Sequence, residues 1–332
     1  MTVADAIQSP AWPAPHAVRR VIANNDMLDD TLHVIAVISN PCNYARRHVL
    51  ANQFLRRMQE EPNVRVYVVE LVYYTHQPFC VARLDCAQHL QLRMTDVPPL
   101  WHKENLVNIG VAKLLPPTWK AMAWIDADIE FESHTWASDT LRVLNGHADI
   151  VQLFSHAVDM DASGAAMRVF TSFGYQYTHG VPWAPVGSTN FWHSGFAWAV
   201  TRRAYEKMGG LFELGVVGSG DMHMALACIG GAARALVSGA HASYRDALAA
   251  LDARMSTLRL CYVPGVVRHY FHGSKSNRKY GERWKIFVSH GYDPATHITH
   301  EATTGVLTVT PACPVQFLAD ILAYFHDRKE DD

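Results

Sequence analysis

Two runs of apolar, largely β-branched residues, HVIAVIS at 33–39 and VRVYVVELVYY at 64–74, limit the fold more than any other feature of the chain. A continuous apolar run of this length is typical of a strand that is buried on both faces of a sheet. The residues between the two runs predict a helix over 44–59. A strand, a helix and a strand in this order predict a βαβ unit with parallel strands and a right-handed crossover.

The rest of the chain continues the alternation of strands and helices. Further strands are predicted at 121–125, 149–154, 195–200 and within 258–271, and further helices at 101–115, 135–144, 201–210 and from 219 or 221 to 229. The segment 155–193 is aromatic and rich in Gly and Pro, which predicts a long loop that lines a site or forms a lid. We therefore expect an α/β protein with an open, mainly parallel sheet flanked by helices, and the 49% of apolar residues suffices for its core.

The chain is expected to contain one large domain. Residues 1–30 hold three prolines and little periodicity, so they predict an N-terminal arm, whereas 31–325 form the domain and 326–332 a solvated polar tail. The 29 basic and 31 acidic side chains give a formal charge of −2, so no basic excess indicates a nucleic-acid partner. The sequence has no run of 18 apolar residues and no signal-peptide pattern, which predicts a cytoplasmic protein without a membrane span.

The short apolar strand predicted at 121–125 ends in Asp126-Ala127-Asp128. Ligands of open α/β sheets bind at the carboxyl ends of the strands, so these two carboxylates are placed where a ligand would lie. Carboxylate oxygens are suitable ligands for Mg²⁺ or Mn²⁺, and diphosphate oxygens could complete the coordination. A second pair, Asp159-Met160-Asp161, lies beyond the end of its predicted strand and is expected to be a solvated loop.

A second group of polar residues occupies 268–280, in the sequence RHYFHGSKSNRKY. His269 and His272 could complete a metal site, and imidazole suits Mn²⁺ better than Mg²⁺. Lys275 and Arg278 add positive charge suited to phosphate, although a basic surface loop would have the same composition.

A third feature is Gly218-Ser219-Gly220-Asp221, at the start of a predicted helix. An Asp in this position commonly caps the helix, but it could also take a proton from an acceptor hydroxyl in a cleft. A set of aromatic residues further upstream could belong to the core or offer surfaces on which a sugar stacks: Trp183, Phe191, Trp192, Phe196 and Trp198.

In this order the motifs resemble nucleotide-sugar-dependent glycosyltransferases of the GT-A (Rossmann-like) fold. The nearest comparison is the β-1,4-galactosyltransferase-like group, and the HGSKSNR run is closer to viral and bacterial GT-A proteins. Residues 101–110 occupy the place of that group's aromatic-Asn-Arg-x-Lys-Leu-Leu-Asn-x-Gly stretch, and Asp126-Ala127-Asp128 that of its Asp-Val-Asp. Residues 194–199, 218–221 and 268–269 match its glycine-rich strand, its Gly-Gly-Glu-Asp segment and its Arg-His, so the resemblance spans about 33–280.

The resemblance implies a role for each matched residue. Residues 31–130 would bind the nucleotide and 131–325 the acceptor, with Asp221 as the base of an inverting transfer. Mn²⁺ or Mg²⁺ would be held by Asp126 and Asp128 with His269 or His272. The donor would contact Asn40, Pro41, Tyr44, Arg46, Lys103, Asn108, Asp126, Gly195, Lys275 and Arg278, and the acceptor Trp183, Trp192 and His193.

The expected activity is the transfer of a sugar from a nucleotide-sugar, with a UDP-sugar favoured, to the hydroxyl of a glycan, a protein, a small molecule or a hydroxymethylated DNA base. One alternative is a nucleotidyltransferase or pyrophosphatase on a similar sheet. The loop SNPCNYARR after the first strand contains no glycine, which counts against that alternative. The other alternative is a carbohydrate-binding protein of the same fold that does not catalyse transfer.

Overall fold

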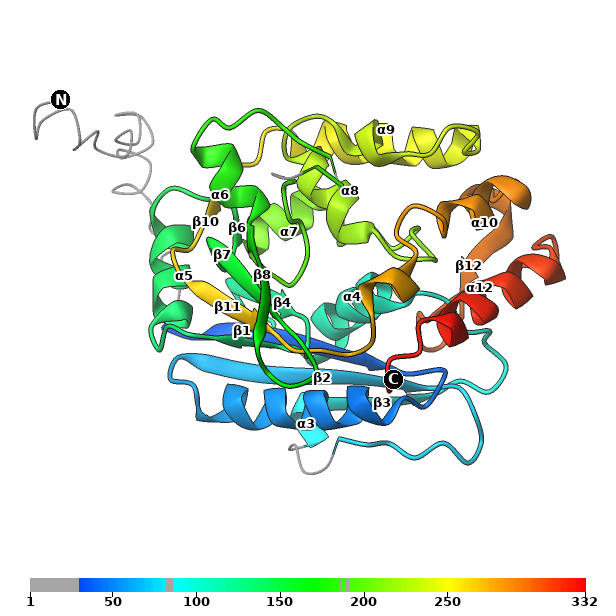
Figure 1. Cartoon of the computed structure of the whole chain (residues 1–332), viewed down its shortest axis with the longest axis horizontal. Helices are drawn as coiled ribbons and strands as arrows, with labels where there is room; N and C mark the ends of the chain where they lie inside the picture. Colours follow the sequence, from blue (N-terminus) through cyan, green and yellow to red (C-terminus); the bar gives the residue numbers. More distant parts are fainter. Residues whose placement is uncertain (1–29, 82–85, 186, 189–190) are drawn as a thin grey trace, which may run out of the picture.

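The computed structural model describes residues 30–81, 86–185, 187–188 and 191–332, so nearly all of the N-terminal arm expected at 1–30 lies outside the described residues. The described chain forms a central sheet with helices on both faces and a smaller sheet beside it (Figure 1).

The central sheet has seven strands in the order β10-β6-β9-β4-β1-β2-β3. β9 runs antiparallel to β4 and β6, and the other neighbouring pairs are parallel. The prediction of an open, mainly parallel sheet is therefore confirmed. The bounds of its strands are β1 (Leu32–Ser39), β2 (Val64–Val72), β3 (His89–Arg93), β4 (Ala121–Ile125), β6 (Ile150–Gln152), β9 (Ala197–Thr201) and β10 (Leu260–Tyr262).

The two faces of this sheet are covered by different helices, because successive side chains of a strand point to opposite faces. Val34 of β1 packs in one core with Phe54 of helix α3 (Ala45–Glu60) and Leu141 of helix α5 (Trp136–Gly146). Ile35 packs in a second core with Val107 of helix α4 (Lys103–Leu114). This second core also includes residues of α7 (Arg202–Met208), α8 (Gly220–Ala227), α9 (Ala242–Met255), α10 (Trp284–Ser289) and α12 (Val315–Asp327).

A second sheet of four strands has the order β5-β11-β7-β8. Its strands are β5 (Ile129–Phe131), β7 (His156–Met160), β8 (Ala166–Thr171) and β11 (Val266–His269), and helix α6 (Phe173–Thr178) follows β8. The expectation of a structureless loop over 155–193 is therefore wrong for 156–178. Two of its aromatic residues, Phe170 and Phe173, are buried core side chains, whereas Tyr177 is exposed.

The register of the second sheet brings distant parts of the sequence together. His269 of β11 pairs with Ile129 of β5, which directly follows Asp128 in the chain. On its other side, His269 pairs with Asp159 of β7. The sheet therefore places Asp128, which follows β4, beside the end of β11. It also places Asp159, from the pair expected in a solvated loop, beside His269.

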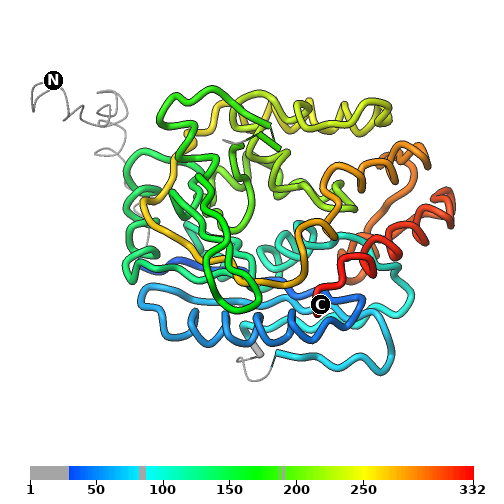
Figure 2. Tube along the Cα trace, in the orientation of Figure 1, coloured from blue at the N-terminus to red at the C-terminus, as the bar shows by residue number. Residues whose placement is uncertain are grey.

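The C-terminal residues return to the centre of the molecule, as Figure 2 shows. Helix α12 ends at Asp327, and the backbone N–H groups of Ala45 and Arg46, at the start of α3, donate to the two carboxylate oxygens of Asp331. Arg328 and Glu330 are 4% and 1% exposed. The expectation of a solvated tail over 326–332 is wrong for these residues, because their charges pair with one another and with Arg47.

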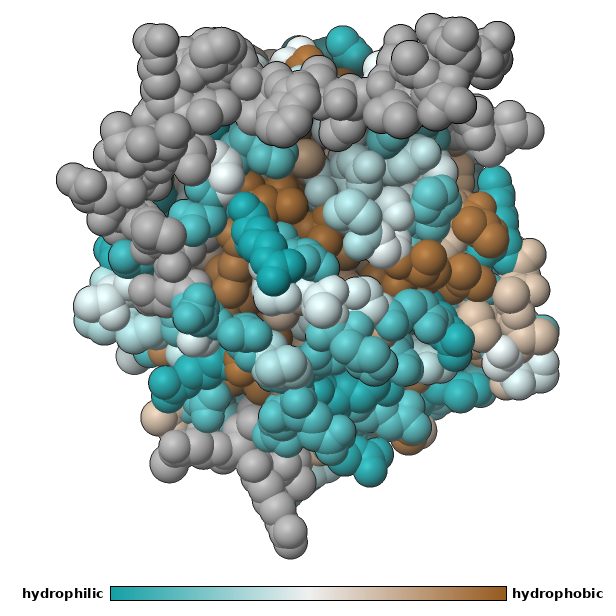
Figure 3. Space-filling model, turned by 90° about the vertical axis from the view of Figure 1, so that its left-hand side faces the viewer, coloured by the Kyte–Doolittle hydropathy of each residue, from teal (hydrophilic) through white to brown (hydrophobic). Residues whose placement is uncertain are grey.

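The remaining elements join these parts. They are the 3₁₀ helices η1 (Cys86–Gln88), η2 (Ala232–Ala235) and η3 (Lys275–Arg278), helix α11 (Pro294–His297), and the antiparallel pair β12 (Ile298–His300) and β13 (Leu307–Val309). On the face that lies to the left in Figure 1, hydrophilic residues surround smaller areas of hydrophobic ones (Figure 3). Within the described residues, no helix is both long and apolar enough to cross a membrane.

Candidate metal and nucleotide site

Asp128, His269 and His272 form a cluster whose ligand atoms all lie within 4.8 Å of one another. The Nε2 atoms of His272 and His269 lie 2.8 Å and 3.9 Å from Asp128 Oδ2. Backbone contacts fix this arrangement, since the N–H of Tyr270 donates to the carbonyl of Asp128 at 2.8 Å. Three of the four predicted metal ligands are thus brought together, one from the predicted nucleotide half of the chain and two from the acceptor half.

The side chains of this cluster fit a divalent cation. Asp128 Oδ1 is buried and accepts no hydrogen bond within the described part of the chain, which leaves one carboxylate oxygen available to a metal. Burial alone would raise the pKa of the Asp128 carboxyl, but His272 and His269 outweigh it and hold that pKa well below its usual value. One carboxylate with two imidazoles is a donor set that suits Mn²⁺ better than Mg²⁺.

Asp126, the fourth predicted ligand, lies outside this cluster and forms an ion pair with Lys103, the first residue of α4. Burial, opposed by Lys103, raises the pKa of the Asp126 carboxyl. Asp126 and Lys103 both line the pocket described below. A direct bond from Asp126 to a metal stays a prediction.

Asp221 lies in the first turn of α8 and accepts a hydrogen bond of 2.8 Å from the N–H of Met222 through Oδ1. Its Oδ2 lies against Gly195, where an added Cβ would be 3.0 Å from it. Burial lowers the pKa of Lys103, but Asp126 and Asp221 together raise it above its usual value. Lys103 is therefore close to two carboxylates: Asp126, next to the metal cluster, and Asp221, the predicted base.

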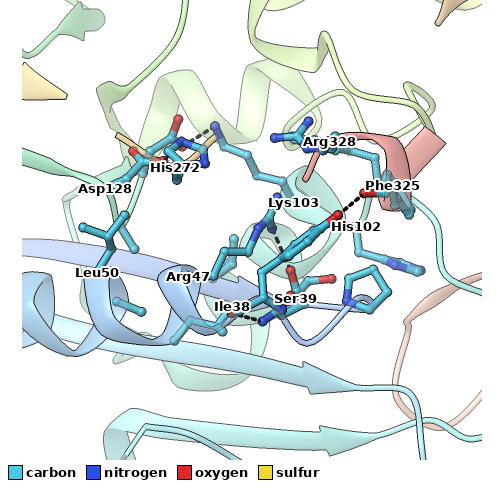
Figure 4. A pocket seen from close by; sticks show the side chains of 18 of the residues that line it. Ile38, Ser39, Arg47, Leu50, His102, Lys103, Asp128, His272, Phe325 and Arg328 are labelled. Atoms are coloured by element: carbon cyan, nitrogen blue, oxygen red, sulfur yellow. Dashed lines mark hydrogen bonds and ion pairs between the residues drawn. The ribbon is translucent and has the colours of Figure 1, made fainter. Parts of the chain in front are cut away.

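A pocket begins at the metal cluster and runs along the end of β1 and the starts of α3 and α4. Figure 4 shows Asp128 and His272 at one end of it, Phe325 and Arg328 at the other, and Arg47 and Lys103 between them. The cations that line it are Arg47, Lys103, Arg278 and Arg328. Arginine and lysine recognise phosphate groups, so the charge of this pocket suits an anionic ligand such as a diphosphate.

The end of the pocket away from the metal cluster offers a flat surface. Trp101 lines it, and the guanidinium of Arg328 lies 5.2 Å from the centre of the Trp101 ring. Trp101 Nε1 is buried and has no hydrogen-bond partner among the described residues. A planar ring with an unused N–H donor suits the base of a nucleotide. Sequence reasoning missed Arg47 and Arg328, and it used Trp101 only as part of a motif.

The residues predicted at the end of the first strand are placed as expected, but their side chains shape the loop. Asn40, Pro41 and Tyr44 all line the pocket. The Asn40 amide donates to the carbonyl of Tyr44 at 2.8 Å and accepts from its N–H at 3.0 Å. The Tyr44 hydroxyl lies 2.9 Å and 2.8 Å from the carbonyls of Phe325 and His326.

Four predicted donor contacts do not line the pocket, and one of them is Gly195, which lies against Asp221 and His193. Arg46 does not line the pocket and its neighbour Arg47 does, because one step along a helix turns the side chain by about 100°. Asn108 is on another face of α4, where its amide bonds the backbone of Leu211 at 3.0 Å and 2.8 Å. Lys275 pairs with Asp159 instead of facing the pocket.

The aromatic residues predicted to bind an acceptor differ in their exposure. Trp192 is only 4% exposed and packs edge-on against Phe173 at 4.9 Å, so it is a core residue rather than a surface for a sugar. Trp183 is partly buried, with the Arg234 guanidinium 5.8 Å from its ring centre. Burial lowers the pKa of His193 to about 3, and its ring lies against Gly195, which also contacts Asp221.

Two buried carboxylates behind the cluster were not expected. The Nδ1 atom of His269 lies 2.8 Å from Asp159 Oδ1, and Asp159 is 2% exposed, so its assignment to a solvated loop is wrong. The Nδ1 atom of His272 lies 3.3 Å from Glu330 Oε2, an ion-pair distance without the alignment of a full hydrogen bond. The only signal in the sequence was the repeated Asp-x-Asp pattern at 159–161.

No protein-family model and no curated protein sequence matches this chain. Solved structures that resemble it include nucleotide-sugar transferases of the GT-A fold. One is a mutant of Drosophila β-1,4-galactosyltransferase 7 with manganese, UDP-Gal and xylobiose (10% identity, 88% of this chain and 99% of that chain, TM-score 0.40). Another is glucosyl-3-phosphoglycerate synthase from Mycobacterium tuberculosis with Mn²⁺, UDP and glucosyl-3-phosphoglycerate (8%, 91% and 92%, TM-score 0.39).

A third similar structure is 4-diphosphocytidyl-2C-methyl-D-erythritol synthase from Anaerococcus prevotii, at 10% identity over 73% of this chain and 90% of that chain, with a TM-score of 0.32. With TM-scores of 0.40 and below, these similarities are weak. The function of this chain is therefore argued below from its own residues.

Proposed function

We propose that this chain is a metal-dependent glycosyltransferase that moves a sugar from a nucleotide-sugar, with a UDP-sugar favoured, to an acceptor hydroxyl. The observation that carries the proposal is the cluster of Asp128, His269 and His272, which opens onto a pocket lined by four cations. A divalent cation and positive side chains in one pocket are what the diphosphate of such a donor requires. The order of the motifs along the sequence supports the same activity.

In this proposal the donor lies along the pocket. Asn40, Pro41 and Tyr44 border the nucleoside, whose base stacks on Trp101. Arg47, Lys103 and Arg278 surround the diphosphate between the nucleoside and the metal cluster. Asp126 keeps the ammonium of Lys103 in place through their ion pair.

Asp128, His269 and His272 are the residues that would hold Mn²⁺ or Mg²⁺. When bound there, the cation supplies Lewis-acid stabilisation of the charge that develops on the departing nucleoside diphosphate. Lys103 and Arg278 add positive charge to the same group, so its departure does not depend on protonation.

Asp221 is the proposed base. Its Oδ2 takes the proton of the acceptor hydroxyl while the hydroxyl oxygen forms a bond to the anomeric carbon. The bond from that carbon to the diphosphate oxygen breaks on the opposite face, and the oxygen leaves with the electron pair, so the configuration inverts. The position of Asp221 supports this role, because it lies beside Gly195 and close to Lys103, the residue that forms an ion pair with Asp126.

The acceptor is the least defined part of the proposal. Trp183 and His193 remain candidates for its binding, whereas Trp192 does not because it is buried. A glycan, a protein and a small molecule are the acceptor classes to test first. A hydroxymethylated DNA base requires its own assay, since the net charge of −2 gives no indication of nucleic-acid binding.

The proposal is tested by hydrolysis of donors, without knowledge of the acceptor. The purified chain is incubated with UDP-, GDP-, CMP- and TDP-sugars in Mn²⁺ or in EDTA, and the released nucleotide is identified. We expect metal-dependent release of a nucleoside diphosphate from one donor, and its loss in Asp128→Ala.

The other outcomes separate the alternatives. Release of a nucleoside monophosphate and a sugar 1-phosphate from a UDP- or GDP-sugar would indicate a pyrophosphatase. Release of pyrophosphate in a parallel assay with a nucleoside triphosphate and a sugar 1-phosphate would indicate a nucleotidyltransferase. Metal-linked binding of a carbohydrate with no turnover of any donor, in the presence of glycan acceptors, would indicate a binding protein. Either result would overturn the proposed transfer.

A further inference from the structure

Both histidines of the cluster contact a second carboxylate through the ring nitrogen that faces away from Asp128. His269 has Nε2 at 3.9 Å from Asp128 Oδ2 and Nδ1 at 2.8 Å from Asp159 Oδ1. His272 has Nε2 at 2.8 Å from Asp128 Oδ2 and Nδ1 at 3.3 Å from Glu330 Oε2. Asp159 belongs to β7 and Glu330 to the C-terminal residues, so two unrelated segments each place a carboxylate beside the outer ring nitrogen, with a hydrogen bond in the case of Asp159.

This arrangement decides which ring nitrogen carries the proton. A neutral imidazole has one N–H and one lone pair, and an ionised carboxylate can only accept a hydrogen bond. For His272 the two carboxylates compete for the proton, because Asp128 Oδ2 lies 2.8 Å from Nε2 and Glu330 Oε2 lies 3.3 Å from Nδ1. For His269, Asp159 is the closer carboxylate, so it favours the proton on Nδ1 and leaves the Nε2 lone pair on the side of Asp128. A metal ligand requires such a lone pair, and a carboxylate on the other ring nitrogen is the usual way to provide it.

Arg278 gives an independent indication for His272. Its Nη2 atom lies 2.7 Å from His272 Nε2. A guanidinium can only donate, so His272 Nε2 accepts this bond and cannot carry the proton of the neutral ring.

Both outer carboxylates are fixed in place. Asp159 and Glu330 are 2% and 1% exposed, and a carboxylate is buried to this extent only when cations pair with it. Lys275 pairs with Asp159. Glu330 is held by Arg47 and by Arg328, whose Nε lies 2.6 Å from Glu330 Oε1.

The backbone also holds Glu330 against the loop that carries His272. Gly273, directly after His272, has φ +84°, and a Cβ at this position would lie 2.8 Å from the carbonyl of Lys329 and 2.9 Å from Glu330 Cα. Only glycine leaves room for the C-terminal backbone to approach this closely.

We propose that Asp159 and Glu330 are positioning residues that set the tautomer and orientation of His269 and His272 for a divalent cation, so that metal binding depends on the last residues of the chain. This inference rests on the proposed function only in assuming that the cluster binds such a cation. Loss of an outer partner of this kind lowers metal affinity about 10- to 100-fold.

The test is a titration of the full-length protein with Mn²⁺, in which free Mn²⁺ is measured by electron paramagnetic resonance. Asp159→Asn and Glu330→Gln are expected to weaken Mn²⁺ binding about 10-fold or more. The matched control is Asp331→Asn, which changes the next acidic residue of the same segment and removes contacts to α3 only; it is expected to change the affinity less than about twofold. Thermal unfolding in EDTA reports the stability of each variant.

A second measurement distinguishes positioning from a structural role. In EDTA, the ¹⁵N chemical shifts of the wild-type histidines are expected to show His269 and His272 protonated on Nδ1, and each variant is expected to shift its own histidine toward a mixture of tautomers. A variant that only loosened the fold would lower the unfolding temperature without this selective change.

The outcomes separate this inference from the proposed function. Failure of the wild type to bind Mn²⁺ would contradict the proposed function. Wild-type binding with unchanged affinity in both variants, or wild-type rings protonated on Nε2, would overturn the positioning role and leave the proposed function standing. If Glu330→Gln does not fold because Arg47 and Arg328 lose their partner, Asp159→Asn and the wild-type tautomers decide the question.

Discussion

The two sheets contribute to the site in different ways. The seven-stranded sheet supplies Asn40 and Asp126, which directly follow β1 and β4 in the sequence, and Asp128, which lies two residues after Asp126. The four-stranded sheet supplies His269 and Asp159 through the pairing of β11 with β7, two strands that are far apart in the chain. The first set is placed by succession along the backbone, and the second by long-range packing.

The two sets also differ in exposure. The side chains of Asp126 and Asp128 are 25% and 21% exposed, so a ligand can reach them. Asp159 and Glu330 are almost fully buried and face cations. In the proposed function, the partly exposed carboxylates after β4 face the ligand, while Asp159 and Glu330 hold the histidines of the cluster in position.

The largest effect is expected from Asp128→Ala. Asp128 is the only carboxylate of the three-residue cluster, and Asp128→Ala leaves the two histidines without it. We expect Mn²⁺ binding to disappear and donor turnover to fall by about 10⁴-fold or more, because the metal supplies several kcal/mol to the transition state. Calorimetric titration with Mn²⁺ and the hydrolysis assay measure the two effects.

The matched control for that variant is Asp161→Ala, the equivalent residue of the other Asp-x-Asp pair. Asp161 Oδ1 accepts hydrogen bonds from Ser163 and Ala165 in the turn between β7 and β8, so its loss affects that turn only. Equal loss of Mn²⁺ binding in both variants would contradict the assignment of the metal site to Asp128, and with it the difference between the two sheets.

Asp221→Asn is expected to have the next largest effect. An amide keeps the size of the side chain and cannot take a proton, so turnover should fall about 10²- to 10⁴-fold while the affinity for the donor and Mn²⁺ is retained. Single-turnover kinetics and a separate donor-binding titration separate the two quantities. Loss of donor affinity with unchanged turnover of bound donor would assign Asp221 to binding instead of proton transfer.

Sequence reasoning could predict residues placed by succession along the chain, and it identified His269 and His272 only through the composition of their motif. Asp128 follows a recognisable buried strand, so its place at the edge of the sheet required no knowledge of the rest of the fold. Arg46 shows the limit of this reasoning, because a shift of one residue in the phase of α3 puts Arg47 in the pocket instead.

The residues placed by long-range packing could not be predicted in the same way. Asp159 has the same local pattern as Asp126, but only the pairing of β7 with β11 shows that it meets His269. Glu330 lies in a charged C-terminal sequence that is typical of solvated ends, and its burial depends on Arg47, a residue from the other end of the chain. Trp192 is an aromatic residue near Gly and Pro, a composition that does not distinguish a sugar-binding surface from a core.

Glu104 tests the comparison with a smaller expected effect. It is a buried carboxyl in α4, a helix that packs on the seven-stranded sheet. It is 3% exposed, and burial, opposed by Lys103, raises its pKa to about 8. The folded state therefore keeps a proton that the unfolded chain loses at a lower pH, so this group makes the protein less stable as the pH rises from about 4.5 to 8. Glu104→Gln should remove this loss, and its stability relative to the wild type should increase by on the order of 3 kcal/mol between pH 5 and pH 7.5.

Urea unfolding of Glu104→Gln and the wild type at the two pH values measures this difference. Glu60→Gln, at the exposed end of α3, is the control and is expected to change stability by less than about 0.5 kcal/mol at either pH. If the difference in unfolding free energy between Glu104→Gln and the wild type were the same at both pH values, Glu104 would be ionised in the folded state, like Asp159 and Glu330.

The smallest effect is expected at Arg278, where the two regions meet. Its guanidinium donates to Nε2 of His272 at 2.7 Å, and that nitrogen also faces Asp128. A cation bound by His272 would need the same lone pair, so Arg278 competes with Mn²⁺ when no nucleotide is present. Arg278→Met should therefore raise the affinity for Mn²⁺ alone about fivefold, the equivalent of one hydrogen bond of about 1 kcal/mol.

The same variant should bind a nucleoside diphosphate with Mn²⁺ more weakly than the wild type, by about 10-fold, because a phosphate contact is lost. Lys279→Met is the matched control, since the side chain of Lys279 is 40% exposed and pairs with Asp327 outside the pocket. Opposite changes in the two affinities for Arg278→Met are the signature of a side chain that either occupies the ligand nitrogen of His272 or contacts the diphosphate. A parallel decrease in both affinities would mean instead that Arg278 supports His272 in the metal site, and it would then belong with Asp159 and Glu330 among the residues that hold the cluster.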